Sequence, residues 1–269
     1  MSAERITSLQ NPRVKELVKL RDQRHRQARE LTIIEEPRVI RRARLAGYPF
    51  HEVWHCPELL AATDPGLLDF LREGPDFEAI EVAPRVLQRI AYKDRPEGVL
   101  VVAPQRRRAL TDLSLSARPL LLVLAGVEKP GNLGAVLRVA DGAGADAVIV
   151  CDMGTDLFNP NVLRASTGAF FTVPVVEEDT PQLLAWLREH RIATVATTPA
   201  AERDYTQADL TGPVALVLGA EDAGLSEAWL EAADGRVRVP MRGECDSLNV
   251  AVTAALVAYE AVRQRTAAG

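Results

Sequence analysis

The second half of the chain repeats one pattern, in which a short apolar run is followed by a loop and then by a stretch with helical character. Leu120–Ala125 (LLLVLA) is the first of these runs, and it contains no polar residue. Such a run is typical of a strand that is buried on both faces of a parallel sheet. We expect further strands at 147–151, 171–176, 192–197, 214–218 and 237–239, and helices at 133–143, 159–166, 180–190 and after Ser226. This alternation predicts an α/β fold with helices on both faces of the sheet.

The stretch from Val237 to Glu260 predicts a ligand site at one edge of this sheet. In open α/β sheets, ligands bind beyond the carboxyl ends of the strands. Here a short strand leads through a polar loop into a helix, for which Asp246 or Ser247 is the expected N-cap. The helix is apolar or small at nearly every position, so we expect it to be buried nearly all round. Its first turn, with Ser247 and Asn249, then faces a pocket suited to a polar small molecule.

The first 104 residues predict a separate and smaller α/β unit. Short strands are expected at 31–34, 53–54, 79–82 and 98–103, with helices between them. The polar segment PQRRRALTDLSLS separates this unit from the apolar run that begins at Leu120. Domain boundaries fall in such polar, proline-containing segments. We therefore expect a first domain at 1–104, a linker at 105–118 and a second domain at 119–269.

The composition of the chain excludes several classes of protein. Of its 269 residues, 47% are hydrophobic and 26% are charged, which is the balance of a globular protein with a substantial core. No apolar run approaches the roughly 18–20 residues that a membrane span requires, and the charged N-terminal sequence does not match a secretory signal. Three scattered cysteines, Cys56, Cys151 and Cys245, are too few for a disulfide framework. We therefore expect a cytoplasmic protein.

The positive charge of the chain is concentrated near its beginning. The net charge is −5, yet residues 1–45 carry twelve Arg and Lys against six Asp and Glu, a local charge of +6. Nucleic-acid binding depends on such local patches rather than on net charge. We expect a basic face that contains Arg21, Arg24, Arg26 and Arg29 to contact RNA. A basic face that is merely solvated is the alternative interpretation.

Two other kinds of ligand are less well supported. His51, His55 and Cys56 lie together in HEVWHC, but their spacing matches no complete zinc site, and we expect no metal. Gly131 and Gly134 follow the first strand of the second half, but they do not form the GxGxxG pattern of a dinucleotide site. An NAD-linked oxidoreductase is therefore the weakest of the functional alternatives.

Two charged side chains lie near the expected ligand edge. Arg138 follows an Asn-Leu-Gly turn, in a helix where an arginine can reach a phosphate or an oxygen nucleophile; a surface ion pair is the alternative. Glu221 lies in the loop LVLGAEDAGLS, where Gly219 allows the backbone to approach a ligand and Gly224 permits a sharp turn. Glu221 can accept from a ligand amine or hold the loop by accepting from backbone N–H groups, and we favour the second role.

Three segments, in this order, resemble the three sequence motifs of the SpoU (TrmH-like) branch of the SPOUT RNA methyltransferases: NLGAVLRVADGAGADAVIV, LVLGAEDAGLSE and VPMRGECDSLNVAVTAALVAYE. The resemblance runs from about Leu120 to Arg263. ITSLQNPRVKELVKL and IIEEPRVIRRA are similar to the L30e-like substrate-binding domain of many ribose 2′-O-methyltransferases. The chain departs from the family pattern at Ala220, where many members carry a polar residue, and at Cys245-Asp246 before the SLN sequence.

The resemblance implies an enzyme that transfers a methyl group from S-adenosylmethionine to a ribose 2′-hydroxyl of RNA. It implies a parallel-sheet SPOUT domain with a C-terminal trefoil knot, preceded by an L30e-like α/β domain that binds the RNA substrate. It also implies a homodimer, packed through the second domain, with an active site shared between the subunits. We expect 23S rRNA as the substrate. A tRNA is the alternative substrate, and a non-catalytic RNA-binding protein with the same fold is the alternative class.

The resemblance also assigns roles to individual residues. Cofactor binding is assigned to Thr197, Leu218, Gly219, Val239, Met241, Ser247, Leu248 and Ala251. Catalysis is assigned to Arg138, Asn132, Ser247 and Asn249. Because a guanidinium stays protonated in proteins, we expect Arg138 to orient the 2′-hydroxyl and the phosphate and to stabilise developing negative charge. Deprotonation of the hydroxyl by Arg138 with help from the phosphate is the alternative.

Overall fold

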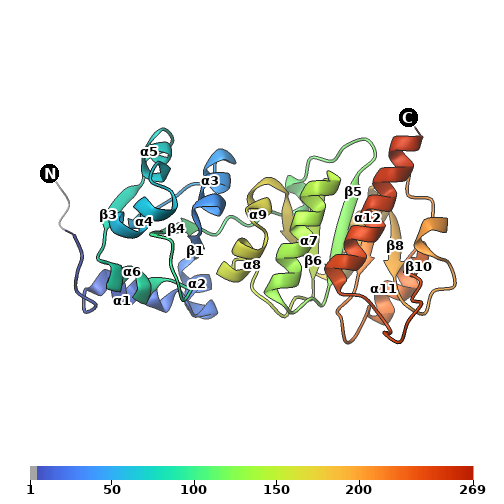
Figure 1. Cartoon of the computed structure of the whole chain (residues 1–269). Helices are drawn as coiled ribbons and strands as arrows, with labels where there is room; N and C mark the ends of the chain where they lie inside the picture. The colour runs from blue at the N-terminus through green and yellow to red at the C-terminus, as the bar shows by residue number, and fades with distance from the viewer. Residues whose placement is uncertain (1–4, 269) are drawn as a thin grey trace. The chain divides into compact units, whose positions relative to one another are not determined.

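The computed structural model describes residues 5–268, which form two compact units (Figure 1). The first unit comprises residues 5–106 together with Phe158–Thr172, and the second comprises Arg107–Leu157 together with residues 173–268. Among the described residues, no helix is both long enough and apolar enough to cross a membrane.

The first unit is built on a mixed four-stranded sheet. Its strands are β1 (Leu31–Glu35), β2 (Glu52–His55), β3 (Glu78–Glu81) and β4 (Val99–Pro104), in the spatial order β1-β4-β2-β3. β4 runs antiparallel to both of its neighbours, whereas β2 and β3 are parallel. Ile33, Trp54 and Leu100 are buried in one core cluster with residues of α1 and α6. The predicted strands of this unit are therefore all present.

Helices surround this sheet, and most of them begin with proline. They are α1 (Pro12–Lys19), α2 (Gln23–Arg29), α3 (Pro37–Leu45), α4 (Pro57–Thr63), α5 (Leu67–Arg72), α6 (Pro84–Ile90), α8 (Pro160–Ala165) and α9 (Ala169–Thr172). Proline suits the first helical position because it lacks the N–H that would have no partner there. Asn11 caps α1 by accepting from the backbone N–H of Arg13 at 2.9 Å.

The basic face expected in the first unit is only partly present. Arg26 is 1% exposed, and its guanidinium donates to the carbonyl oxygens of Leu20 and Arg21 at 2.9 and 2.8 Å. The prediction that Arg26 contacts RNA is therefore wrong. This side chain is buried, and its hydrogen bonds go to the carbonyl groups that follow the end of α1. Arg29 is paired with Glu16 at 2.8 Å.

The segment Phe158–Thr172 belongs to the first unit although it lies between strands of the second. The Thr32 hydroxyl donates to the Phe158 carbonyl at 2.8 Å, and the rings of Phe171 and Tyr48 meet edge to face at 4.9 Å between centroids. The strand expected at 171–176 is wrong in its first half. There the aromatic residues form α9 and pack in an aromatic cluster, and β7 begins only at Val175.

The second unit is built on a six-stranded sheet in which all neighbouring strands are parallel. Its strands are β5 (Leu120–Ala125), β6 (Ala147–Cys151), β7 (Val175–Glu177), β8 (Ala193–Thr197), β9 (Val214–Leu218) and β10 (Gly235–Val237), in the spatial order β10-β8-β9-β5-β6-β7. Every residue of β5, β6 and β9 is buried. The predicted α/β fold with a parallel sheet is confirmed.

Helices cover both faces of this sheet. Alternate strand residues such as Leu121, Val123 and Val217 pack in one core cluster with Leu183 of α10 (Thr180–Glu189) and Trp229 of α11 (Glu227–Ala232). α7 (Pro130–Ala143) and α12 (Val250–Ala267) lie side by side and contact strands of the same sheet (Figure 1). Two short 3-10 helices, η1 (Leu110–Asp112) and η2 (Tyr205–Gln207), lie in the connections.

Two expectations for the last helix are wrong. Its N-cap is Asn249, whose side chain accepts from the backbone N–H of Ala251 at 3.0 Å, rather than Asp246 or Ser247. The helix is also not buried all round, because Val252 is 47% exposed and Tyr259 is 50% exposed. The later start leaves residues 238–249 as a loop at the carboxyl end of β10.

Candidate active site

A cavity of about 550 Å³ lies where the carboxyl ends of β8 and β9 meet the loop before α12. Seven of the eight residues assigned to cofactor binding line it: Thr197, Leu218, Gly219, Val239, Met241, Ser247 and Leu248. Ala251, the eighth, does not line the cavity. It lies in the first turn of α12, where its backbone N–H donates to the side chain of the N-cap residue. Among the four residues assigned to catalysis, Ser247 is the one that lines the cavity.

The carboxylate of Glu221 joins the start of α7, the loop after β9 and the start of α12. Its Oε1 accepts from Nδ2 of Asn132 at 3.0 Å and from Nδ2 of Asn249 at 2.6 Å. Nδ2 of Asn249 also donates to Oδ1 of Asn132 at 3.1 Å. Lys129 donates to the other carboxylate oxygen and forms an ion pair with it. The structure thus brings together two of the assigned catalytic residues, Asn132 and Asn249, through a carboxylate that also lines the cavity.

The ion pair sets the charge state of this carboxylate. The hydrogen bond from Lys129 is the main cause that lowers the pKa of Glu221, and the same contact raises the pKa of Lys129. Both groups are therefore charged at neutral pH. A carboxylate with a lowered pKa is a weak base, so Glu221 acts here as an anchor for side-chain amides rather than as a proton acceptor.

The loop after β9 folds tightly back on itself. The backbone N–H of Ala220 donates to the Gly224 carbonyl at 3.2 Å, and the Gly224 N–H donates to the Ala220 carbonyl at 3.0 Å. A Cβ on Gly219 would lie 2.3 Å from the carbonyl carbon of Gly224, which no real side chain permits. Glycine is therefore required at 219 because the backbone of the same loop passes close to it, rather than because a ligand does. Gly224, with φ of 68°, makes the expected sharp turn.

Arg138 lies apart from the other assigned residues of its own chain. It is an exposed residue of α7 and does not line the cavity. It follows Asn132 by six positions, which at 3.6 residues per turn points the two side chains about 120° apart around the helix. Within residues 5–268 its guanidinium has no hydrogen bond or ion pair.

The cavity fits S-adenosylmethionine in size and in chemistry. Its volume lies within the range of about 300–1,000 Å³ that is usual for small-molecule sites. Val239 and Leu248, which are partly buried, offer apolar surface, as an adenine ring requires. The carboxylates of Glu221, Asp222 and Asp246 line the same cavity and complement a cation such as a sulfonium.

The sequence did not predict Lys129 as a site residue, and it predicted Glu221 with the wrong partners. Glu221 was expected to accept from backbone N–H groups, whereas it accepts from three side chains. The signal available in the sequence was that Asn132, Glu221 and Asn249 each follow a strand end at one sheet edge. Lys129 carries no comparable signal, because it is recognisable only through its contact with Glu221.

A parallel sheet with a polar cavity at its carboxyl edge is typical of α/β proteins that bind a small polar ligand there. The model of the SpoU rRNA Methylase family matches residues 119–259. The model of the MRM3-like substrate binding domain matches residues 11–101. The chain belongs to the SpoU rRNA methylase family, and the resemblance of its three motifs to that family is confirmed.

Known relatives match three quarters or more of the chain. The 23S rRNA (guanosine-2′-O-)-methyltransferase RlmB of Ralstonia nicotianae is 39% identical over 210 residues, which cover 76% of this chain and 84% of that protein. A crystal structure of an RNA 2′-O ribose methyltransferase is 43% identical, with a TM-score of 0.85, and the match covers 98% of this chain and 100% of the other.

A third relative was solved with its cofactor. The SpoU methyltransferase AviRb from Streptomyces viridochromogenes, in complex with AdoMet, matches with a TM-score of 0.87 and 29% identity over 96% of this chain and 99% of its own. Family membership makes the present chain an RNA methyltransferase that uses S-adenosylmethionine as its methyl donor. The predicted enzyme class and cofactor are confirmed.

Proposed function

We propose that the chain methylates a ribose 2′-hydroxyl of 23S rRNA in the cytoplasm. Two findings support this substrate. The Ralstonia relative is named for the 2′-O-methylation of guanosine in 23S rRNA, and the chain covers 84% of its length. The first unit also matches a substrate binding domain over residues 11–101. We assign RNA binding to residues 1–104, a linker role to 105–118 and methyl transfer to 119–269.

One observation carries the proposal for the site. Asn132 and Asn249 are held on the same oxygen of Glu221, at the rim of the cavity that Ser247 lines. S-adenosylmethionine supplies an electrophilic methyl group on a sulfonium ion. The carboxylates at the cavity complement that positive charge, and Ser247 and Asn249 hold the ribose hydroxyl by hydrogen bonds.

Arg138 completes the proposed site from a second copy of the chain. Val252 and Tyr259 are both exposed on α12 and lie seven residues apart, so they share one face of the helix. Exposed apolar patches mark interaction surfaces. In the proposed homodimer a second copy covers this face of α12 next to α7. Arg138 of the partner subunit then orients the 2′-hydroxyl and the phosphate and stabilises the negative charge that develops on the oxygen.

The two loops of the cavity also carry the proposed trefoil knot. Residues 219–226 follow β9, and residues 238–249 follow β10. In the proposed knot the chain threads one of these loops through the other before it enters α12. Such threading is rare.

The proposed function is tested by methylation of purified RNA. We expect the protein, with radiolabelled S-adenosylmethionine, to label 23S rRNA isolated from cells that lack the gene, and not rRNA from cells that carry it. Mapping of 2′-O-methyl groups then identifies one nucleotide. Label that enters only tRNA would establish the alternative substrate, and cofactor binding without any methyl transfer would indicate a non-catalytic RNA-binding protein.

A further inference from the structure

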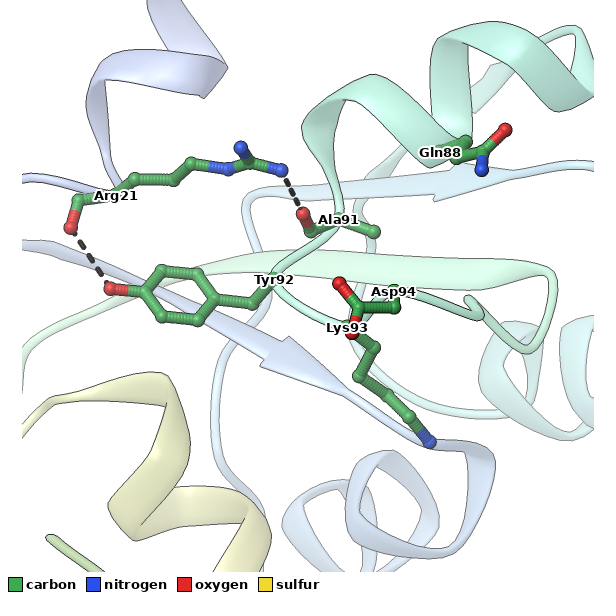
Figure 2. A pocket seen from close by; sticks show the side chains of 6 residues that line it. All are labelled: Arg21, Gln88, Ala91, Tyr92, Lys93 and Asp94. Carbon is green, nitrogen blue, oxygen red and sulfur yellow. Dashed lines mark hydrogen bonds between the residues drawn. The ribbon is translucent and has the colours of Figure 1, made fainter.

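The first unit contains a pocket of about 560 Å³ (Figure 2), whereas the cofactor cavity is formed by residues of the second unit. The connection between α6 and β4 lines the pocket of the first unit with Ala91, Tyr92, Lys93 and Asp94. Arg21, from the turn between α1 and α2, and Gln88, from α6, complete the lining. Figure 2 shows the Arg21 guanidinium, the Tyr92 ring and the Asp94 carboxylate gathered around this connection.

The pocket is held by a dense set of hydrogen bonds. The buried carboxylate of Glu35 accepts from the backbone N–H groups of Tyr92 and Lys93. The Tyr92 hydroxyl donates to the Arg21 carbonyl at 2.9 Å, and the Arg21 guanidinium donates to the Ala91 carbonyl. A binding site needs such pre-organisation because ordering a flexible loop weakens binding. The connection between α6 and β4 is fixed by Glu35 and by Arg21, so it is suited to binding a ligand.

The backbone beside the pocket is strained. Glu36 has φ of 73° and ψ of 123°, which is unfavourable for any residue with a side chain. Lys93 pairs with Glu36 at 2.9 Å and with Glu97 at 2.6 Å. Strain of this kind persists where the surroundings hold it, and it is concentrated at functional sites.

The groups that line the pocket differ in what they can offer a ligand. The Lys93 ammonium is occupied by its two carboxylates, so it does not bind an anion. Arg21 donates one guanidinium N–H group to the Ala91 carbonyl, and its other guanidinium N–H groups remain available to a ligand. Within residues 5–268, the side chains of Asp94 and Gln88 make no hydrogen bond. The pocket therefore offers one cation, one aromatic ring, one carboxylate and one amide.

This set matches a single nucleotide better than it matches a phosphate backbone. A guanidinium binds phosphate through paired N–H groups, and an aromatic ring stacks on a base. A carboxylate accepts from the N–H groups at the edge of a base, but it repels phosphate. Sequence-specific RNA recognition uses unpaired bases that are read in this way.

We propose that the pocket binds one unpaired nucleotide of the RNA substrate. In this assignment Arg21 binds the phosphate, Tyr92 stacks on the base, and Asp94 with Gln88 reads the edge of the base. The assignment rests on the proposed function for the identity of the RNA. It adds a recognition site in the first unit that contributes to the choice of substrate.

The test measures equilibrium binding of the full-length protein to a 23S rRNA transcript, without cofactor. We expect Arg21→Gln and Tyr92→Leu each to raise Kd about tenfold. Asp94→Ala distinguishes a nucleotide pocket from a phosphate-binding patch, because it changes Kd in opposite directions in the two cases. A nucleotide pocket loses its contact with the base edge, so Kd rises about fivefold, whereas a phosphate-binding patch loses a repulsive charge and binds more tightly.

Matched controls remove equal charges elsewhere in the first unit. Arg72→Gln and Glu73→Gln change exposed residues outside the pocket and are expected to leave Kd unchanged. All variants must keep the wild-type melting temperature and affinity for S-adenosylmethionine. The proposal is overturned if Asp94→Ala binds as tightly as the wild type or more tightly, or if Arg21→Gln and Tyr92→Leu behave like the controls.

A crosslinking measurement keeps this test independent of methyl transfer. A transcript that contains 4-thiouridine is irradiated with the wild-type protein, and the crosslinked peptides are identified. We expect crosslinks to the peptide that contains Tyr92, and crosslinks only to other segments of the first unit would contradict the pocket. If the protein binds and crosslinks in this way but transfers no methyl group, the proposed function fails while the nucleotide pocket stands.

Discussion

Asn249 donates a hydrogen bond of 2.6 Å to Oε1 of Glu221, the same oxygen that accepts from Asn132 at 3.0 Å. Asn249 is also the N-cap of α12, where its Oδ1 accepts from the Ala251 N–H. One side chain therefore fixes both the start of the last helix and its position against the loop after β9. The shape of the cofactor cavity depends on this pair, because Glu221 and the residues on either side of Asn249 line it.

We predict that Glu221→Gln weakens the binding of S-adenosylmethionine about tenfold. The substitution keeps the shape of the side chain but removes the charge that holds Lys129 and strengthens the bonds from Asn132 and Asn249. Hydrogen bonds to a charged group contribute about 1–2 kcal/mol more than the replacement would. Calorimetric titration measures the effect. Glu231→Gln, on α11 and outside the cavity, is the control, and an unchanged Kd in Glu221→Gln would contradict the anchoring role.

The tight loop after β9 gives a second prediction. Gly219→Ala places a Cβ 2.3 Å from the backbone of Gly224, so the loop must move away from its observed position. Overpacking of this kind costs about 1–3 kcal/mol. We expect affinity for S-adenosylmethionine to fall more than tenfold in a titration. Gly243→Ala is the matched control, because a Cβ there meets nothing within 4 Å; equal losses in both variants would refute the clash.

The parallel sheet could be predicted from the sequence because its signal is local. A strand such as Leu120–Ala125 is apolar at every position, and the loops and helices that separate such runs are visible in the same stretch of sequence. The three motif segments could be recognised for a related reason, since each is continuous. Their places at the carboxyl edge of the sheet then follow from the fold.

The contacts that complete the site could not be predicted, because their partners are distant in the sequence. Glu221 lies 89 residues from Asn132 and 28 residues from Asn249. The burial of Arg26 depends on the turn between α1 and α2, which composition does not reveal. Local capping signals also misplaced the start of α12, since Asp246, Ser247 and Asn249 are all good caps.

Glu35 provides a prediction about pH. Its carboxylate is buried beneath the connection between α6 and β4, and burial raises its pKa. An acid with a raised pKa binds more protons in the folded state than in the unfolded state. Its contribution to the free energy of unfolding therefore falls as pH rises through the folded pKa. In urea unfolding between pH 4.5 and 8, we expect the stability of the wild type relative to Glu35→Gln to decrease with rising pH, and a constant difference would contradict this.

The position of Arg138 leads to a prediction about the proposed homodimer. Arg138 does not line the cavity of its own chain, so Arg138→Ala should bind S-adenosylmethionine with the wild-type Kd. Methyl transfer should fall by about 100-fold or more, as it does when one group that stabilises developing negative charge is removed. Weaker cofactor binding in this variant would indicate that Arg138 supports the cavity instead.

A mixed dimer then shows whether the site is shared. Arg138→Ala and Gly219→Ala subunits carrying different tags are co-expressed, and the dimer that contains both is isolated. If Arg138 acts across the interface, one of the two sites combines an intact cavity with an intact arginine from the partner subunit. At an S-adenosylmethionine concentration well below the Kd of the Gly219→Ala cavity, both parent dimers are slow, and the mixed dimer should then show about half of the wild-type rate. If Arg138 acts within its own chain, each subunit of the mixed dimer keeps its defect, and the measured rate stays at the level of the parents.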